Sequence, residues 1–166
     1  SGFLLGEVVD IVYNQKQIAI LDVSASAHTP DCLEMPYRPA VIKISRNTES
    51  KSKQVLCEAD KGECLSDIAT QNGDTRQHNQ TKQNVCGKYA YRLGGPTCLA
   101  GDIIGDFSFD TPLQVGDRIA LLDMLHYTIV KNTTFNGVPL PSLGVIENGK
   151  FTLLKSFGYK DYKERN

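Results

Sequence analysis

The stretch GGPTCLAGD, at positions 94–102, carries the residues best suited to chemistry. Cys98 lies there on a predicted bend, with glycines on both sides that let the backbone approach a ligand closely. The carboxylate of Asp102 follows four positions later. A thiol in such a place can act as a nucleophile or a proton donor, whereas the structural alternative is a small buried apolar residue.

The remaining cysteines and the histidines do not form a recognisable metal site. The five cysteines include no CxxC pair, so they fit neither a disulfide framework nor a zinc ribbon, and we expect free thiols. His28, His78 and His126 are isolated from one another, and we therefore predict no metal. A cysteine hydrolase would require one of these histidines, such as His28 or His126, to lie beside Cys98, and the sequence does not establish that approach.

Length and composition favour a single globular domain covering residues 1–166. The chain is 40% hydrophobic and 22% charged with a formal net charge of −1, which gives no sign of a nucleic-acid-binding surface or of disorder. No apolar run approaches the ~20 residues of a membrane span, and the first residues lack a signal-peptide pattern. We expect a cytoplasmic protein with no membrane or nucleic-acid partner.

The elements that must position Cys98 are predicted to be mainly β-strands. Short β-branched or alternating runs recur along the chain, without a long helical period. Strands are predicted at 8–12, 18–22, 40–44, 85–93, 103–110 and 118–124, with a final hairpin at 143–146 and 151–154. Asn148-Gly149 suits its turn, and 159–166 is a charged, helix-compatible tail. We predict a Greek-key-like β-barrel or sandwich.

Two further segments are not predicted as strands. Residues 24–39 contain three prolines and are predicted to be an irregular loop, which at this length is often functional. Residues 46–83 are rich in polar side chains and are predicted to be a surface excursion from the β-domain.

Three segments resemble carboxynorspermidine (carboxyspermidine) decarboxylases. They are 27–39 (AHTPDCLEMPYRP), 95–102 (GPTCLAGD), and 126–128 (HYT) followed by 134–137 (TFNG). These enzymes belong to the alanine racemase and ornithine decarboxylase-like family, whose cofactor is pyridoxal 5'-phosphate. The resemblance implies that this chain is the C-terminal β-domain of a fold-type III decarboxylase in polyamine biosynthesis. It also implies a separate N-terminal β/α-barrel that supplies the Schiff-base lysine, and a homodimer; the fragment alone should be inactive.

The resemblance implies roles for Cys98 and Tyr127. Cys98 matches the cysteine that protonates the substrate carbon after carbon dioxide leaves, across the dimer interface. A thiol suits this task because its reference pKa of about 8.5 keeps it mostly protonated at neutral pH. Tyr127 matches the tyrosine that donates a hydrogen bond to the cofactor phosphate, its structural alternative being a half-buried strand aromatic.

The implied substrate is a polyamine with one carboxylate, whose ammonium groups require acidic partners. Asp31, Glu34 and Asp102 are the candidate amine-binding residues, and Arg38 is a further candidate substrate contact. Leu99 stands where relatives that act on amino acids have an acidic residue, which disfavours ornithine and diaminopimelate. The alternatives are an amino-acid decarboxylase of the same family, or a non-catalytic β-domain that binds a ligand or partner.

Overall fold

The computed structural model describes residues 2–35, 37–44 and 87–165. The predicted polar excursion at 46–83 lies outside the described residues, as do Cys57, Cys64, Cys86 and His78. None of the helices in the described ranges is long and apolar enough to cross a membrane.

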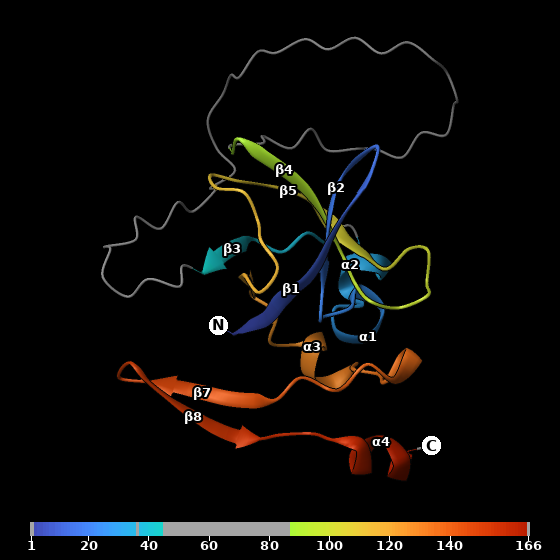
Figure 1. Ribbon diagram of the computed structural model, residues 1–166. Coiled ribbons are helices and arrows are strands. Elements are labelled where there is room, and N and C mark those ends of the chain that lie inside the picture. The colour runs from blue at the N-terminus through green and yellow to red at the C-terminus, as the bar shows by residue number, and fades with distance from the viewer. Residues whose placement is uncertain (1, 36, 45–86, 166) are drawn as a thin grey trace.

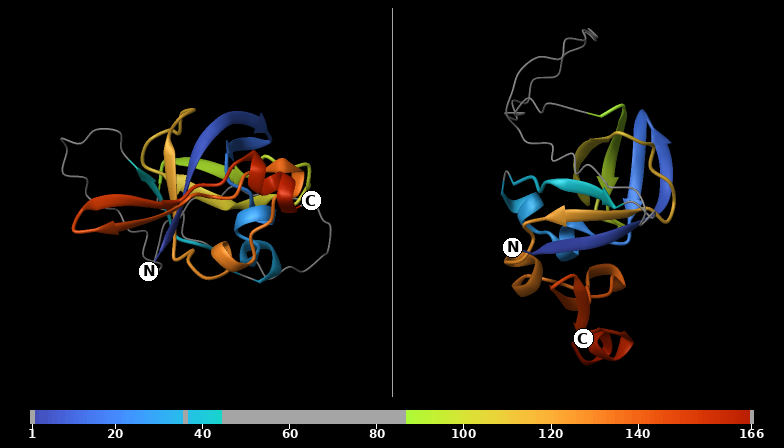
Figure 2. Two further views of the ribbon diagram at one scale, coloured as in Figure 1. Left: turned by 90° about the horizontal axis from the view of Figure 1, so that it is seen from below. Right: turned by 90° about the vertical axis from the view of Figure 1, so that its left-hand side faces the viewer.

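A curled six-stranded sheet forms the body of the described structure (Figure 1). In spatial order its strands are β3 (Val41–Ile44), β6 (Arg118–Leu122), β1 (Phe3–Asn14), β2 (Lys16–Leu21), β4 (Tyr89–Gly94) and β5 (Ile103–Phe109). The β2–β4 pair is parallel and the other pairs are antiparallel. In Figure 2, β3 and β6 run across the direction of β2 and β4. The prediction of a mainly β-domain is confirmed.

Strand β1 is shared between the two halves of the sheet. Its residues 3–7 pair with β6, and its residues from Val8 to the end of the strand pair with β2. The register shifts between Val8 and Asp10, and such a bulge increases the local twist of a strand. Leu4, Gly6 and Val8 alternate inward with exposed neighbours, as the period of two requires. The bend in β1 therefore turns the sheet around its core.

The apolar core lies inside this curve. The sheet contributes core side chains from β1, β2, β4, β5 and β6, and its most completely enclosed residues are Val8, Ala19, Leu21, Leu93, Ile119 and Leu121. Tyr91 and Leu93 point inward from β4 while Tyr89 is exposed, which follows the alternation in the sequence. The Tyr91 hydroxyl accepts a hydrogen bond from the backbone N–H of Leu113 (3.2 Å), so its polar end is satisfied inside the core.

Residues 24–39, predicted to be irregular, contain two short helices, α1 (Ala25–His28) and α2 (Asp31–Glu34). The Ser24 hydroxyl caps α1 by accepting a hydrogen bond from the backbone N–H of Ala27 (3.1 Å). Pro30 immediately precedes α2 and supplies the backbone angle of a first helical turn. Each helix is one turn long, too short to leave a periodic pattern in the sequence.

Helix α3 (Tyr127–Val130) and the 3-10 turn η1 (Phe135–Gly137) follow the sheet strands. Tyr127 therefore begins a helix and is not a strand residue. Helix α1 contacts both α2 and α3, and the three helices gather beside the loop between β4 and β5 (Figure 1). This end of the sheet brings together all the segments that carry the resemblance.

The C-terminal hairpin is also confirmed. Strands β7 (Leu143–Glu147) and β8 (Lys150–Lys155) pair only with each other among the described strands. Asn148 and Gly149 have φ values of 51° and 74°, which is the positive pair that a type I′ turn requires. The predicted helical tail forms α4 (Tyr159–Arg165).

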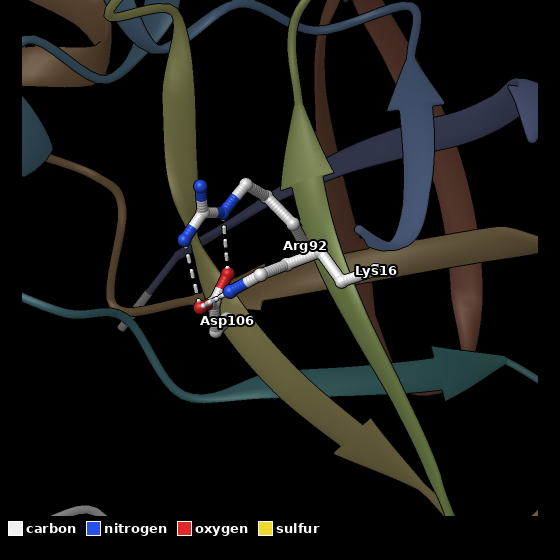
Figure 3. Close-up of polar contacts among 3 residues, drawn as sticks. All are labelled: Lys16, Arg92 and Asp106. Carbon is white, nitrogen blue, oxygen red and sulfur yellow. Dashed lines mark hydrogen bonds and ion pairs between the residues drawn. The ribbon is translucent and has the colours of Figure 1, made fainter. Parts of the chain in front are cut away.

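One polar cluster fastens β2, β4 and β5 on the outer surface of the sheet (Figure 3). Asp106 accepts two hydrogen bonds from the Arg92 guanidinium (2.6 and 2.9 Å) and one from Lys16 Nζ (2.9 Å). The hydrogen bonds from Arg92, followed by those from Lys16, lower the pKa of Asp106 from 3.8 to about 2. The three side chains thus link β2 to β4 and β5, which are distant from it in the sequence.

Replacing Asp106 by Asn should lower the free energy of unfolding at pH 7 by about 0.5–1 kcal/mol, a modest loss because water screens a surface ion pair. The native carboxylate is stabilised above the unfolded value of 3.8, and this contribution disappears as the pH falls toward 2. Thermal unfolding should therefore show a difference between Asp106→Asn and wild type that shrinks below pH 4. Asp110→Asn, at an exposed carboxylate just after β5, is the control; an equal loss there would contradict the assignment.

Candidate functional site

Cys98 lies on an exposed loop, residues 95–102, that joins the ends of β4 and β5. Gly94 at the end of β4 pairs with Ile103 at the start of β5, so the loop has a fixed base. Inside it, the backbone N–H of Asp102 donates to the carbonyl of Leu99 (2.9 Å), and the N–H of Gly95 donates to the carbonyl of Asp102 (2.8 Å). The thiol therefore sits on a bend closed by its own backbone.

The Asp102 carboxylate is only 4% exposed and accepts hydrogen bonds both from the start of α1 and from its own loop, residues 95–102. One oxygen accepts from the backbone N–H groups of Ala25 (2.7 Å) and Ser26 (3.2 Å). The other accepts from the backbone N–H (3.1 Å) and the hydroxyl (2.6 Å) of Thr97, and the Ser24 hydroxyl lies 3.0 Å from both oxygens. The sequence predicted Asp102 to bind substrate amines, whereas in the structure its oxygens accept from protein donors, and the substrate contact stays a prediction.

Asn136 holds the Cys98 backbone from the opposite side. The N–H of Cys98 donates to Asn136 Oδ1 (3.2 Å), and Asn136 has a φ of 56° within η1. A positive φ is uncommon outside glycine, and asparagine is one of the residues that tolerates it. The GPTC and TFNG segments, separate in the sequence, are thus in direct contact. The sequence indicated both segments but did not indicate this link.

Tyr127 and Asp31 line one open pocket of about 420 Å³. The Tyr127 side chain is 45% exposed, and the structure gives its hydroxyl no hydrogen-bond partner among the described residues. Tyr37 and Asp123 line the same pocket, together with Met35, Met124, His126 and Val130. Burial raises the pKa of Tyr37, and the carboxylates of Asp123 and Asp31 raise it further, so the three groups interact.

Asp123 is a candidate functional residue that the sequence did not reveal. It follows β6 with a φ of 57°, an unusual backbone conformation for a residue other than glycine. Such outliers cluster at functional sites, and here the residue lines the pocket that Asp31 also lines. Sequence patterns do not report φ, so this signal was available only from the structure.

Glu34 and Arg38, the other predicted substrate contacts, do not line this pocket. Glu34 forms an ion pair with Lys131 on the surface, and the hydrogen bond that Lys131 Nζ donates to Glu34 is the main cause that raises the pKa of Lys131. Arg38 stacks its guanidinium over the Phe107 ring, 4.2 Å from the centroid. Burial lowers the pKa of Arg38, with the nearby Asp106 opposing that shift.

His28 is a structural residue in this fold. Its Nδ1 accepts from the backbone N–H of Ser24 (3.1 Å), and its Nε2 lies 3.0 Å from the carbonyl of Pro139. Burial lowers the pKa of His28 below 6.5, against smaller contributions from Pro139, Asp22 and Asp102. With both ring nitrogens occupied, His28 is not available as a base for Cys98. His126 lines the pocket with Tyr127, and no described hydrogen bond joins it to Cys98.

The sequence has clear relatives of known activity. It is 44% identical to carboxyaminopropylagmatine decarboxylase of Synechocystis sp., with 99% of this chain and 34% of that protein covered. It is 42% identical to carboxynorspermidine/carboxyspermidine decarboxylase of Campylobacter jejuni, with 100% of this chain and 37% of that protein covered. The chain thus spans about a third of the length of these relatives.

A solved structure and a family model agree with these matches. The crystal structure of C. jejuni carboxynorspermidine decarboxylase complexed with norspermidine superposes with a TM-score of 0.69 at 39% identity, covering 99% of this chain and 38% of that one. Residues 1–124, which include Cys98 but not Tyr127, match the model of the pyridoxal-dependent decarboxylase, C-terminal sheet domain. The chain belongs to this family of pyridoxal-dependent decarboxylase C-terminal sheet domains.

Proposed function

We propose that this chain is the sheet domain of an enzyme that decarboxylates carboxynorspermidine or carboxyspermidine, in the biosynthesis of norspermidine or spermidine. The observation that carries the proposal is the Cys98 loop: an exposed thiol whose backbone is held by Asp102 through Thr97 and by Asn136. A proton donor must be both accessible and fixed in place, and this loop satisfies both requirements. The C. jejuni relative, named for these two substrates, supports the choice of reaction.

The remainder of the active site would come from outside this chain. The relatives are about three times longer, which is consistent with an additional N-terminal domain. We expect that domain to be the β/α-barrel that provides the Schiff-base lysine and most phosphate contacts. We further expect a cytoplasmic homodimer in which Cys98 reaches the active site of the neighbouring subunit, and an isolated sheet domain without activity.

The hydrogen-bond donors on this chain can supply some of the contacts that hold pyridoxal phosphate. The Tyr127 hydroxyl, open to the pocket, can donate one hydrogen bond to a phosphate oxygen. When bound, the cofactor supplies the electron sink that allows a carboxylate to leave as carbon dioxide. The task left to Cys98 is then to give its thiol proton to the substrate carbon that lost the carboxylate, leaving a thiolate that solvent reprotonates.

Asp31 and Asp123 are suited to hold a distal ammonium of the substrate. Both line one pocket, and no described salt bridge joins either of them to a Lys or Arg side chain. Glu34, in contrast, is already paired with Lys131. An ammonium ion between two carboxylates forms charge-assisted hydrogen bonds, whereas an apolar wall alone would leave it unpaired. The pocket thus favours Asp31 over Glu34 as the amine-binding residue.

A second substrate is favoured by a specific observation. The Synechocystis relative, 44% identical, is named for carboxyaminopropylagmatine, a compound that ends in a guanidinium group. Paired carboxylates accept a guanidinium as readily as an ammonium, because guanidinium presents parallel N–H donors. Turnover of carboxynorspermidine, carboxyspermidine and carboxyaminopropylagmatine by the intact enzyme, measured as carbon dioxide release from each substrate supplied alone, decides between them. The amino-acid alternatives predict release from diaminopimelate or ornithine, and a non-catalytic domain predicts release from none.

In the intact enzyme, Cys98→Ala should lower kcat for formation of the correct amine by about 100-fold or more, because a positioned proton donor is lost. Absorbance of the bound cofactor should stay near normal. The control is Cys32→Ala, which removes the partly buried free thiol on α2 and should retain turnover. Equal turnover in Cys98→Ala and wild type would remove Cys98 from the reaction.

Tyr127→Phe should weaken cofactor binding by about 10- to 100-fold, the effect of one hydrogen bond to a charged group. Titration of the cofactor-free intact enzyme with pyridoxal phosphate, followed by fluorescence, measures the dissociation constant. Tyr13→Phe is the matched control, since Tyr13 is an exposed tyrosine on β1 outside the pocket. An unchanged dissociation constant for Tyr127→Phe would place its hydroxyl away from the phosphate.

Asp31→Asn and Asp123→Asn should each raise KM for the polyamine substrate by about 10-fold, because each removes one charge-assisted partner of an ammonium group. Glu34→Gln should change KM less, since Glu34 already pairs with Lys131. Steady-state kinetics of the three variants test this order. A larger change in KM for Glu34→Gln than for Asp31→Asn would reassign the ammonium site to Glu34.

A further inference from the structure

Asp102 is a buried carboxylate whose described hydrogen-bond donors are all neutral groups. Its oxygens accept from three backbone N–H groups and two hydroxyls, and no described Lys or Arg side chain forms a salt bridge with it. An ionised carboxylate enclosed in protein is costly unless its oxygens are hydrogen-bonded, and here the donors converge from two segments. The carboxylate therefore links the two segments that supply these donors.

The two segments are the start of α1 and the loop that carries the thiol. The oxygen Oδ1 binds the backbone of Ala25 and Ser26, while Oδ2 binds the backbone and side chain of Thr97. Thr97 directly precedes Cys98, whose own N–H donates to Asn136. The two consecutive peptide groups that precede the Cys98 side chain are thus held by different parts of the fold.

Gly95 adds an independent sign that the carboxylate must occupy this place. A Cβ built on Gly95 would overlap the Asp102 carboxylate, with both oxygens and the carboxyl carbon inside van der Waals contact. Even the smallest side chain at position 95 would therefore displace the carboxylate from its donors. The glycine is needed here for space, because its backbone does not take a positive φ.

We propose that Asp102 is a positioning residue, which anchors loop 95–102 to the start of α1 and thereby holds the Cys98 thiol at one location for proton transfer. The functional part of this inference rests on the proposed role of Cys98. The anchoring part concerns only the loop and can be measured without any substrate.

Asparagine cannot replace Asp102 in this place. Each oxygen of the carboxylate accepts from a backbone N–H, that of Ala25 on one side and that of Thr97 on the other. An amide in either orientation would place its NH₂ group against one of these donors. The variant Asp102→Asn therefore releases one side of the junction while it retains almost the same volume.

The test uses the intact enzyme and compares Asp102→Asn and Gly95→Ala with the control Asp117→Asn. Asp117 is a matched buried carboxylate, 6% exposed, in the turn before β6. It accepts a hydrogen bond from the backbone N–H of Gln114 and forms an ion pair with Lys43 of β3. Both experimental variants should lower kcat about 10- to 100-fold, the range expected from a misplaced reacting group, with KM within about twofold of wild type. The control should lose thermal stability but retain kcat.

Hydrogen exchange of the peptide covering 95–102 gives the second measurement. Both experimental variants should accelerate its exchange, because the Thr97 N–H loses or shifts its acceptor, while Asp117→Asn should leave it unchanged. Unchanged exchange and kcat in Asp102→Asn, or an equal loss of kcat in Asp117→Asn, would overturn the inference. If Asp102→Asn does not fold, Gly95→Ala carries the test. A wild-type enzyme that decarboxylates no polyamine would refute the proposed function, while the exchange data would still decide the anchoring.

Discussion

The double pairing of strand β1 is the constraint on which the rest of the structure depends. A strand that hydrogen-bonds to β6 along its first half and to β2 along its second half must change direction between them. The bulge between Val8 and Asp10 allows this change without leaving the strand unpaired. The curvature that results encloses one core and brings β4 and β5 around to the side where the short helices lie (Figure 1).

The helical end of the sheet carries the candidate site. The strands of the sheet give rigid supports, whereas the candidate functional residues lie on loops and single helical turns between them. Cys98 is far in the chain from Tyr127 and Asn136, and its backbone N–H is joined to Asn136 by a hydrogen bond, while α1 contacts α3, which begins at Tyr127. The site is therefore a product of long-range packing.

The sequence predicted the strands well because alternation of apolar and polar residues is a local property. The hairpin turn at Asn148-Gly149 was predictable for the same reason, since its positive φ values depend on two adjacent residues. The helices α1 and α2 were not predicted, because one turn leaves no period to detect. The roles predicted for Cys98 and Tyr127 came from a family resemblance, because their residue types alone do not specify those roles.

The contacts of the acidic candidate residues could not be predicted from the sequence. A carboxylate four residues after a thiol looks available for a substrate, and only coordinates reveal that the donors to Asp102 include residues 24–26, far away in the chain. Equally, only coordinates separate Asp31, on the pocket wall beside Asp123, from Glu34, paired with Lys131. The sequence gives the charge of each side chain, but the fold decides which group that side chain contacts.

The buried imidazole of His28 gives this scaffold a particular response to acid. Its Nδ1 accepts from Ser24, the residue that also contacts Asp102, and its Nε2 lies against Pro139, just beyond η1. The acceptor role of Nδ1 requires the neutral ring, and burial lowers the pKa of His28, so the folded protein resists protonation there. The unfolded chain takes up that proton as the pH falls below 6.5, and stability is lost from there downward. Acid therefore weakens the support beneath the Cys98 loop before it reaches the carboxylate of Asp106, whose stabilising contribution persists to a much lower pH.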